Sequence, residues 1–181
     1  MSRRTASKQL GTAADFPARD DLYGAMAIGN EPWTWTEWAS GMPLILFTVL
    51  IHVSGFGLSR RWVIRTSKRV MQTRHPEIMF VTVISLMTLL ATSLHATEAG
   101  IWAVAYRFLG ALPDNRSAML YSLNAMTSYG HINLQLEERW HLMGAMEALN
   151  GWLLFGLSTA FLFWVVGKVF SSLDRRERDG A

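Results

Sequence analysis

The stretch LMGAMEALNGWLLFGLSTAFLFWVVGKVF, residues 142–170, decides the fold. Between Trp152 and Val166 it has almost no polar side chains at helical spacing. It therefore lacks the polar face that a helix on the surface of a globular protein turns toward water. A helix needs about 20 mainly apolar residues to cross the hydrocarbon core of a bilayer, and this stretch is long enough. It therefore predicts a membrane-spanning helix.

Two further apolar runs lie upstream of this stretch. The first spans Met42 to Leu58, and the second begins after Pro76 and continues past a polar interruption to Leu112. The 181-residue chain is 50% hydrophobic and only 17% charged, whereas average proteins have about 25% charged residues. We therefore predict an all-α membrane protein with three transmembrane helices. The lack of cysteine excludes disulfide frameworks, thiolate metal sites and cysteine nucleophiles.

The charge distribution sets the predicted topology. The segment from Ser59 to Pro76 is rich in Lys and Arg and holds no acidic residue, so the positive-inside rule places it in the cytoplasm. The tail after the third run shares that side in a three-span chain. The polar head, with its Trp-rich interfacial end, then lies outside. We expect the inner (cytoplasmic) membrane, an outer N-terminus and a cytoplasmic C-terminus, with membrane lipids and not nucleic acid as partners.

The segment between the second and third runs is too long for a turn and too mixed for another crossing. It reads PDNRSAMLYSLNAMTSYGHINLQLEERW, residues 113–140. Asp114 or Asn115 is a suitable N-cap for a short helix over residues 117–127, which the turn-forming pair Tyr129-Gly130 ends. Irregular backbone is tolerated in a bilayer only where protein encloses it or where it lines water. We therefore predict a short helix followed by an extended strand that dips between the spans.

The stretch from Thr97 to Val166 resembles the pore domain of the potassium-channel superfamily, especially its small bacterial branch of ion-channel family proteins. The matching pieces are AMLYSLNAMTSYGHIN, residues 118–133, and RWHLMGAMEALNGWLLFGLSTAFLFWVV, residues 139–166. The resemblance implies an outer helix, a re-entrant pore helix, a filter loop and an inner helix, assembled as a homotetramer. The implied parts are a polar head (1–40), a peripheral span with its basic cytoplasmic loop (41–76), the pore domain (77–170) and a short cytoplasmic tail (171–181).

The resemblance assigns the selectivity filter to six residues. The family reads Thr-Val-Gly-Tyr-Gly-Asp there, and its main-chain carbonyls replace the hydration shell of the ion. An ungapped alignment keeps only the first glycine, whereas a gapped alignment matches Tyr129-Gly130 to the family's Tyr-Gly and loses the earlier glycine. A β-branched residue disfavours the positive φ that glycine permits, so we expect a remodelled outer half around Ile132. The assigned filter residues are Ser128, Tyr129, Gly130, His131, Ile132 and Asn133.

This degenerate filter leaves two hypotheses of function. One is a weakly selective channel for a monovalent cation such as potassium or sodium. The other is a non-conducting accessory or sensing subunit that works with another membrane subunit. The sequence contains no phosphate-binding loop, nucleophile elbow or HExxH pattern, so we expect neither an enzyme nor a bound cofactor.

Polar residues within the spans are candidate functional residues because they are unfavourable in lipid. His95 and Glu98 are three positions apart on one helical face, where a hydrogen bond or ion pair is feasible. They are interpreted either as a proton- or metal-sensitive latch behind the filter or as a polar clasp onto the short helix. His52 also lies within a span. Counted from the cytoplasmic ends, however, its depth differs from that of His95 by roughly 16 Å, which argues against a haem held by both.

The third span carries its own polar group. Glu147 and Asn150 precede Gly151. Glu147 has two possible sets of partners. One is the short helix, through its backbone amides or through Ser122 and Asn124, and the other is His95 of the second span. Gly151 is interpreted either as a gating hinge or, with Gly144, as a small residue for close packing.

The outer mouth carries two acidic residues and two histidines. Glu137 and Glu138 are interpreted as an acidic vestibule that concentrates cations, or as an ordinary solvated face. His131 and His141 lack an acidic spacing motif, and we predict no metal site from them.

Overall fold

The computed structural model describes residues 35–70, 74–130 and 134–180. Within these ranges the chain is helical, without a β-strand. Three of its helices are long and apolar enough to cross a membrane, in agreement with the predicted all-α fold and the predicted number of spans. Residues 1–34 of the predicted polar head lie outside the described residues. The elements are α2 (Trp35–Val70), α3 (Pro76–Phe108), α4 (Asn115–Met126), the short 3-10 helix η2 (Glu138–Trp140) and α5 (His141–Gly180).

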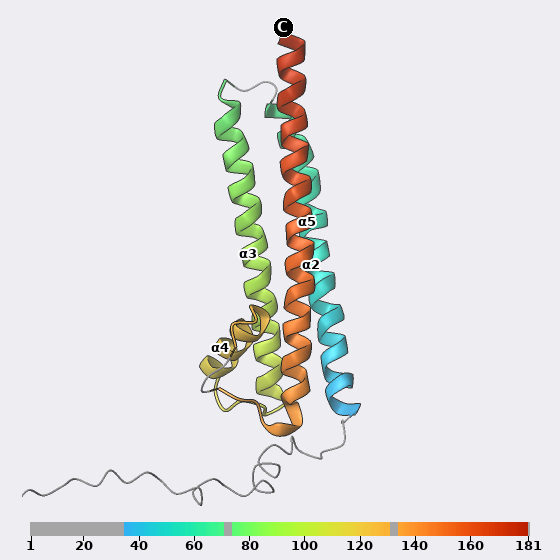
Figure 1. Cartoon of the computed structure of the whole chain (residues 1–181), viewed down its shortest axis with the longest axis vertical. Coiled ribbons are helices and arrows are strands. Elements are labelled where there is room, and N and C mark those ends of the chain that lie inside the picture. Colours follow the sequence, from blue (N-terminus) through green and yellow to red (C-terminus); the bar gives the residue numbers. More distant parts are fainter. Residues whose placement is uncertain (1–34, 71–73, 131–133, 181) are drawn as a thin grey trace, which may run out of the picture. The chain divides into compact units, whose positions relative to one another are not determined.

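The three long helices pack side by side. α2 and α5 run in the same direction and α3 runs against them, and each contacts the other two (Figure 1). Because only residues 71–75 separate α2 from α3, the two must be antiparallel neighbours. The short α4 packs against α3 and α5. The end of α2 and the end of α5 therefore lie at the same end of the bundle, as expected for two basic segments that share one side of a membrane.

Two apolar clusters hold the helices together, one toward each end of the bundle. The larger cluster gathers side chains of α3, α4 and α5, with Trp102, Tyr106 and Met143 fully buried. The smaller cluster joins the long helices toward the basic end through residues such as Val63 and Val165. Between the two clusters lies a set of buried polar residues that includes His52, Glu98 and Ser158.

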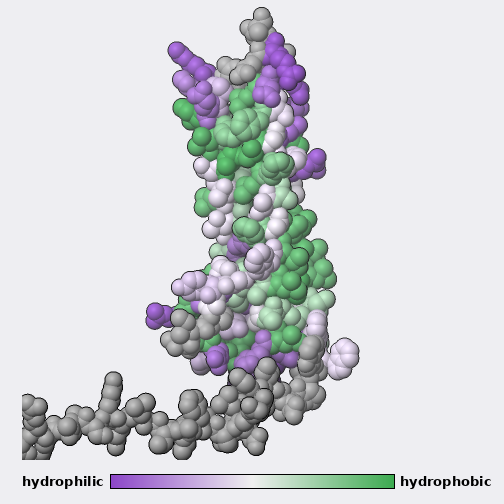
Figure 2. Space-filling model, viewed as in Figure 1, coloured by the Kyte–Doolittle hydropathy of each residue, from purple (hydrophilic) through white to green (hydrophobic). Residues whose placement is uncertain are grey.

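The outer surface of the bundle is apolar along its middle. Hydrophilic residues gather toward the two ends of the described helices, with hydrophobic residues between them (Figure 2). Large apolar side chains that no other helix of the chain covers include Leu50 on α2, Leu89 on α3 and Phe163 on α5. Lipid tails or further protein must cover such a surface, because large apolar patches are rarely left in water.

The α2 helix is longer than the sequence analysis predicts. The loop expected from Ser59 onward is wrong, since the helix continues to Val70. The basic residues of this stretch stand on the exposed surface of the helix, while Val63 and Ser67 on its other face are buried. Five basic residues thus mark one end of an amphipathic helix: Arg60, Arg61, Arg65, Lys68 and Arg69. Only residues 71–75 link this helix to α3.

The start of α5 is fixed by a residue of α2. The first amides of a helix have no partner within that helix. The Leu142 amide donates to the Oε1 atom of Glu37, which is buried, at 2.9 Å. A carboxylate at this position also suits the positive end of the helix dipole. The contact places the beginning of α2 beside the beginning of α5.

Candidate functional site

The α4 helix is held at its N-terminus by the cap that the sequence predicts. Asp114 is the N-cap, and its side chain accepts hydrogen bonds from the amide and the hydroxyl of Ser117 at 2.9 and 2.7 Å. These bonds lower the pKa of Asp114 below its ordinary value. Asn115, the alternative cap, is instead the first helical residue and accepts from Nε of Arg107 at 2.9 Å. The predicted helix over 117–127 is confirmed with a shift of two residues at its start and one at its end.

The C-terminal end of α4 lies beside the first third of α5, ten positions past the start of that helix. A Cβ atom at Gly151 would collide with the backbone carbonyl of Met126, so glycine is what allows the two helices to approach. The indole N–H of Trp152 donates to the hydroxyl of Ser128 at 2.8 Å. Trp152 is eleven positions past the start of α5, or about 16 Å along its axis. The chain between α3 and α5 thus reaches roughly half the thickness of a bilayer core.

The segment after α4 has an irregular backbone. Ser128 and Gly130 both adopt positive φ, 54° and 87°. Thr127, Ser128, Tyr129 and Gly130 are exposed on the single chain, and the Tyr129 side chain keeps 82% of its surface. The remaining predicted filter residues, His131, Ile132 and Asn133, lie outside the described residues. The expected extended strand is not formed in residues 134–137, which are irregular.

Glu147 joins three helices through one buried carboxyl group. Its Oε2 accepts from the hydroxyl of Tyr106 on α3 at 2.7 Å, and its Oε1 is hydrogen-bonded to the hydroxyl of Ser122 on α4. The same Ser122 oxygen lies 2.7 Å from the carbonyl oxygen of Ala99. Of the partners left open for Glu147, the structure selects Ser122, adds Tyr106, and places His95 with other residues. Gly144 and Gly151 face α4 beside this group, as close packing requires.

A second polar cluster lies between the two apolar clusters. Nδ1 of His52 on α2 is 2.7 Å from Oε1 of Glu98 on α3, and Nε2 of His52 is 3.0 Å from Oγ of Ser158 on α5. Nε2 of His95 lies 3.0 Å from the same Ser158 oxygen, and its Nδ1 lies 3.5 Å from Oε2 of Glu98. Glu98 and His52 have no exposed surface. The four side chains form a closed ring of contacts among the three long helices.

This ring corrects two expectations about the histidines. The predicted difference in depth between His52 and His95 is wrong, because their ring centroids are only 5.1 Å apart. The error follows from the length of α2: counted from the true helix end at Val70, His52 is as deep as His95 is from Pro76. The expected clasp onto the short helix is also wrong. His95 and Glu98 hold α2 and α5, and it is Glu147 that holds α4.

The other predicted site residues are placed apart from this ring. The side-chain amide of Asn150 donates to the hydroxyl of Thr48 on α2 at 2.9 Å. The α5 helix continues through Gly151 without a break. Glu137 and Glu138 are exposed at the start of η2, where Glu137 pairs with Arg139 at 2.9 Å.

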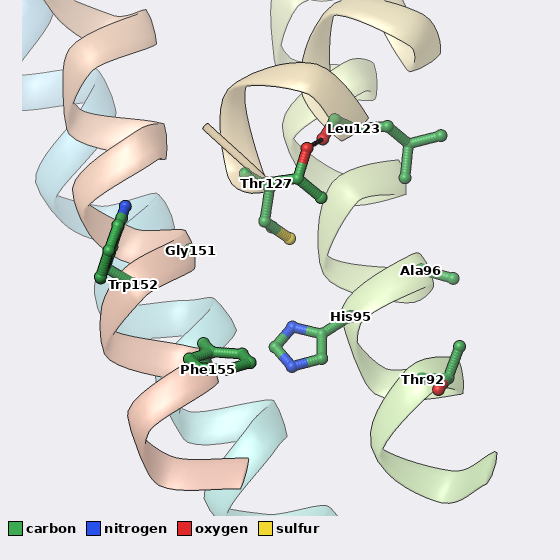
Figure 3. Close-up of a pocket in the computed structure, with 9 residues that line it drawn as sticks. Thr92, His95, Ala96, Leu123, Thr127, Gly151, Trp152 and Phe155 are labelled. Carbon is green, nitrogen blue, oxygen red and sulfur yellow. Dashed lines mark hydrogen bonds between the residues drawn. The ribbon is translucent and has the colours of Figure 1, made fainter. Parts of the chain in front are cut away.

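A pocket of about 500 Å³ opens between α3, α4 and α5. Figure 3 shows His95 pointing from α3 into the space beside Phe155, with Gly151 and Trp152 on the α5 side and Thr127 at the α4 end. His95 thus connects the buried ring to an open cavity, and its side chain is 28% exposed. The lining is Thr92, His95, Ala96, Leu123, Met126, Thr127, Gly151, Trp152 and Phe155.

Sequence reasoning missed two participants in these networks, Tyr106 and Ser158, and it separated a third, His52, from its true partners. Tyr106 and Ser158 carry single hydroxyls in apolar runs, where they look like ordinary span residues. His52 was visible as a polar residue in a span, which is the signal that would have found it if the helix ends had been placed correctly.

Comparisons with family models, with curated proteins and with solved structures find no match to this chain.

Proposed function

We propose that the protein is a monovalent cation channel, in which the segment after α4 from four copies lines a central pathway. The observation that carries the proposal is exposed irregular backbone at mid-depth. Residues 127–130 are exposed on the single chain, and Ser128 is bonded to Trp152, which lies eleven residues into a long apolar helix. The amides of residues 127–129 bond to carbonyls of α4, so the polar groups that require enclosing protein or water at such a depth are the backbone carbonyls of this irregular segment.

The orientation of α4 supports a cation as the ligand. Its C-terminal end lies against Gly151 of α5, and the C-terminus of a helix carries the negative end of the dipole. Backbone carbonyls and the Ser128 hydroxyl are the oxygen ligands found there. In this proposal Glu137 and Glu138, which are exposed, add negative charge at the outer mouth and raise the local concentration of cations.

We propose weak selectivity between potassium and sodium. Selective filters present successive carbonyls in one fixed geometry. The sequence keeps Gly130 but has Ile132 where the family resemblance implies a second glycine. A β-branched side chain resists positive φ by on the order of 1–3 kcal/mol, and this is the reason that we propose a less selective filter.

The test is cation flux through the purified full chain in liposomes, measured in turn with potassium, sodium and a larger organic cation. Gly130→Ala is the test variant and Gly110→Ala is its matched control. Both glycines have positive φ, 87° and 69°, and both have open space where a Cβ would stand. The backbone penalty is therefore similar. We expect Gly130→Ala to lower flux at least tenfold or to change the ratio of the ions, and Gly110→Ala, between α3 and α4, to change neither.

The accessory-subunit hypothesis predicts a different result. Such a protein gives no flux with any of the three cations. If the double variant His131→Tyr with Ile132→Gly then conducts, the natural chain has a pore that its own filter sequence keeps from conducting. The channel proposal then fails for the natural chain. If neither protein conducts, the channel proposal also fails, and another protein encloses residues 127–130 in place of a water-filled pore.

A further inference from the structure

We propose that His52, His95 and Glu98 form a binding site for a divalent transition-metal ion of the zinc type. The proposal is independent of ion conduction. The three residues come from two helices, and Ser158 of a third helix supports both histidines. One ligand atom from each of the three residues lies within 4.8 Å of the other two.

The contacts of the ring are one hydrogen short. Neutral His52 and neutral His95 contribute one N–H each, Ser158 contributes one O–H, and an ionised Glu98 contributes none. Three hydrogens must therefore serve four contacts. The 2.7 Å contact of His52 with Glu98 and the two 3.0 Å contacts with Ser158 are filled. Two lone pairs are left facing each other across the 3.5 Å gap between His95 and Glu98.

The buried oxygen at this gap has no hydrogen-bond partner in the described part of the chain. It is Oε2 of Glu98, on a side chain without exposed surface. Leaving a buried carboxylate oxygen unpaired is unfavourable by about 1–3 kcal/mol or more. The site therefore favours one additional positive charge between Glu98 and His95.

A metal ion would give a partner to both Nδ1 atoms and to the Glu98 carboxylate, while the hydrogen of the Ser158 hydroxyl would then need an acceptor outside the ring. When Nδ1 of each histidine binds the metal, each Nε2 carries the hydrogen, and both N–H groups donate to the two lone pairs of the Ser158 oxygen. The structure places both Nε2 atoms at 3.0 Å from that oxygen and both Nδ1 atoms toward Glu98. No proton needs to leave the ring, because each neutral imidazole keeps one hydrogen.

The donor set fits zinc-type chemistry. Two imidazoles and one carboxylate bind Zn²⁺ at about 2.0–2.2 Å, with a fourth position left for water. Ligand atoms around such a tetrahedral ion lie about 3.3 Å apart. The present distances from Glu98 to the two histidines, 2.7 and 3.5 Å, bracket this value. The pocket at His95 provides the entry path that a buried metal site requires.

The test uses Co²⁺ as the probe, with the full chain in detergent micelles and without a polyhistidine tag. Four-coordinate Co²⁺ absorbs visible light far more strongly than hydrated Co²⁺, so the spectrum reports the site directly. We expect one Co²⁺ bound per chain and its displacement by Zn²⁺. If no such band appears even with a large excess of Co²⁺, the ring is a hydrogen-bonded clasp that holds a proton only, and the proposal is overturned.

Variants separate the ligands from the residue that positions them. His95→Gln and Glu98→Gln should weaken Co²⁺ binding by more than about 100-fold and remove the band, whereas Ser158→Ala should weaken it by about 10- to 100-fold and keep the band. His141→Gln is the matched control, because its ring contacts the Leu136 carbonyl outside the cluster. Unchanged Co²⁺ binding in His95→Gln and Glu98→Gln would contradict the assignment.

A measurement on the unaltered protein covers the case in which a variant fails to fold. Zn²⁺ should raise the unfolding temperature of the natural chain, because the metal binds the folded state. Mg²⁺ should not, since it prefers oxygen ligands in octahedral geometry. An equal response to both ions, or a response to neither, would count against a zinc-type site. Neither readout depends on whether the protein conducts ions.

Discussion

At the scale of single residues, Glu147 is the most informative side chain, because hydrogen counting defines its state. The Ser122 hydroxyl has one hydrogen but contacts two oxygens, the carbonyl of Ala99 and Oε1 of Glu147. All contacts are satisfied when the Glu147 carboxyl carries a proton and donates it to Ser122, while Tyr106 donates to Oε2. A neutral carboxyl is also the less costly form between buried helices.

We therefore predict that Glu147→Gln is tolerated. The amide N–H₂ group donates to Ser122 as the protonated carboxyl does, and the amide oxygen still accepts from Tyr106. The free energy of unfolding should change by less than about 1 kcal/mol. Glu147→Leu should lose about 1–3 kcal/mol, because the buried Tyr106 hydroxyl is left without an acceptor. Chemical unfolding in detergent measures both variants, and equal losses would show that Glu147 is ionised in the native protein.

Which residues are functional candidates was predictable, but which residues they contact was not. His95, Glu98, Glu147 and Asn150 stand out because polar groups are rare in lipid-facing sequence, and all four prove to be linked to another helix. Their partners depend on the relative depth of three helices. An error of twelve residues in the predicted end of a helix shifts the predicted depth of a side chain by about 18 Å along the helix axis. This error is large enough to separate His52 from its true neighbours in the prediction.

At the scale of elements, the contact of α4 with α5 depends on Gly151. We predict that Gly151→Ala destabilises the protein, because the added Cβ meets the backbone of Met126 and α4 must move as a unit. Overpacking of this kind typically costs about 1–3 kcal/mol. Gly156→Ala is the matched control in the same helix, where a Cβ meets nothing within 4 Å. It should be neutral or stabilise the helix by up to about 1 kcal/mol. Thermal unfolding compares the two, and equal behaviour would contradict the packing interpretation.

The cap of α4 gives a prediction on pH. The pKa of Asp114 is lowered by the hydrogen bonds from Ser117, so the folded chain holds the ionised form more strongly than the unfolded chain does. The stabilisation is present above the unfolded pKa of about 3.9 and disappears as the pH falls through the lower, folded value. The Ser117 amide should therefore lose its protection against hydrogen exchange only below about pH 4, where protection is the ratio of the intrinsic exchange rate to the measured rate. Asp114→Asn keeps a capping oxygen but does not titrate, and should remove this dependence. A transition that persists in Asp114→Asn would assign it to another group.

Helix existence was predictable from composition, whereas helix length was not. The three spans follow from apolar runs that no other structure can accommodate. The extension of α2 from Ser59 to Val70 has a basic surface that resembles a loop in composition, and only the buried Val63 and Ser67 on its inner face reveal the helix. The prediction for α4 was accurate to two residues because a capping residue and a glycine-containing turn mark its limits.

At the scale of the whole molecule, lipid alone cannot cover the whole surface of the single chain. Its middle surface is apolar, which lipid covers well, but residues 127–130 present polar backbone at the same depth. The amides of residues 127–129 bond to carbonyls of α4, but lipid tails cannot bind the carbonyl oxygens of this segment. Closed rotational symmetry solves the problem, because each copy then covers the same segment of its neighbours around a shared axis.

We therefore predict that the purified protein is a tetramer, with four times the 20.4 kDa mass of the chain in native mass spectrometry. The chain contains no cysteine, so single-cysteine variants can be tested without further changes. Tyr129→Cys should give cross-linked dimers with a short bifunctional thiol reagent, because the proposed tetramer brings four copies of this position to one axis. Trp35→Cys, equally exposed at 87% against 82% but on the outermost span, should give none. A monomeric mass, or cross-links at Trp35→Cys without any at Tyr129→Cys, would place the polar segment against something other than its own copies.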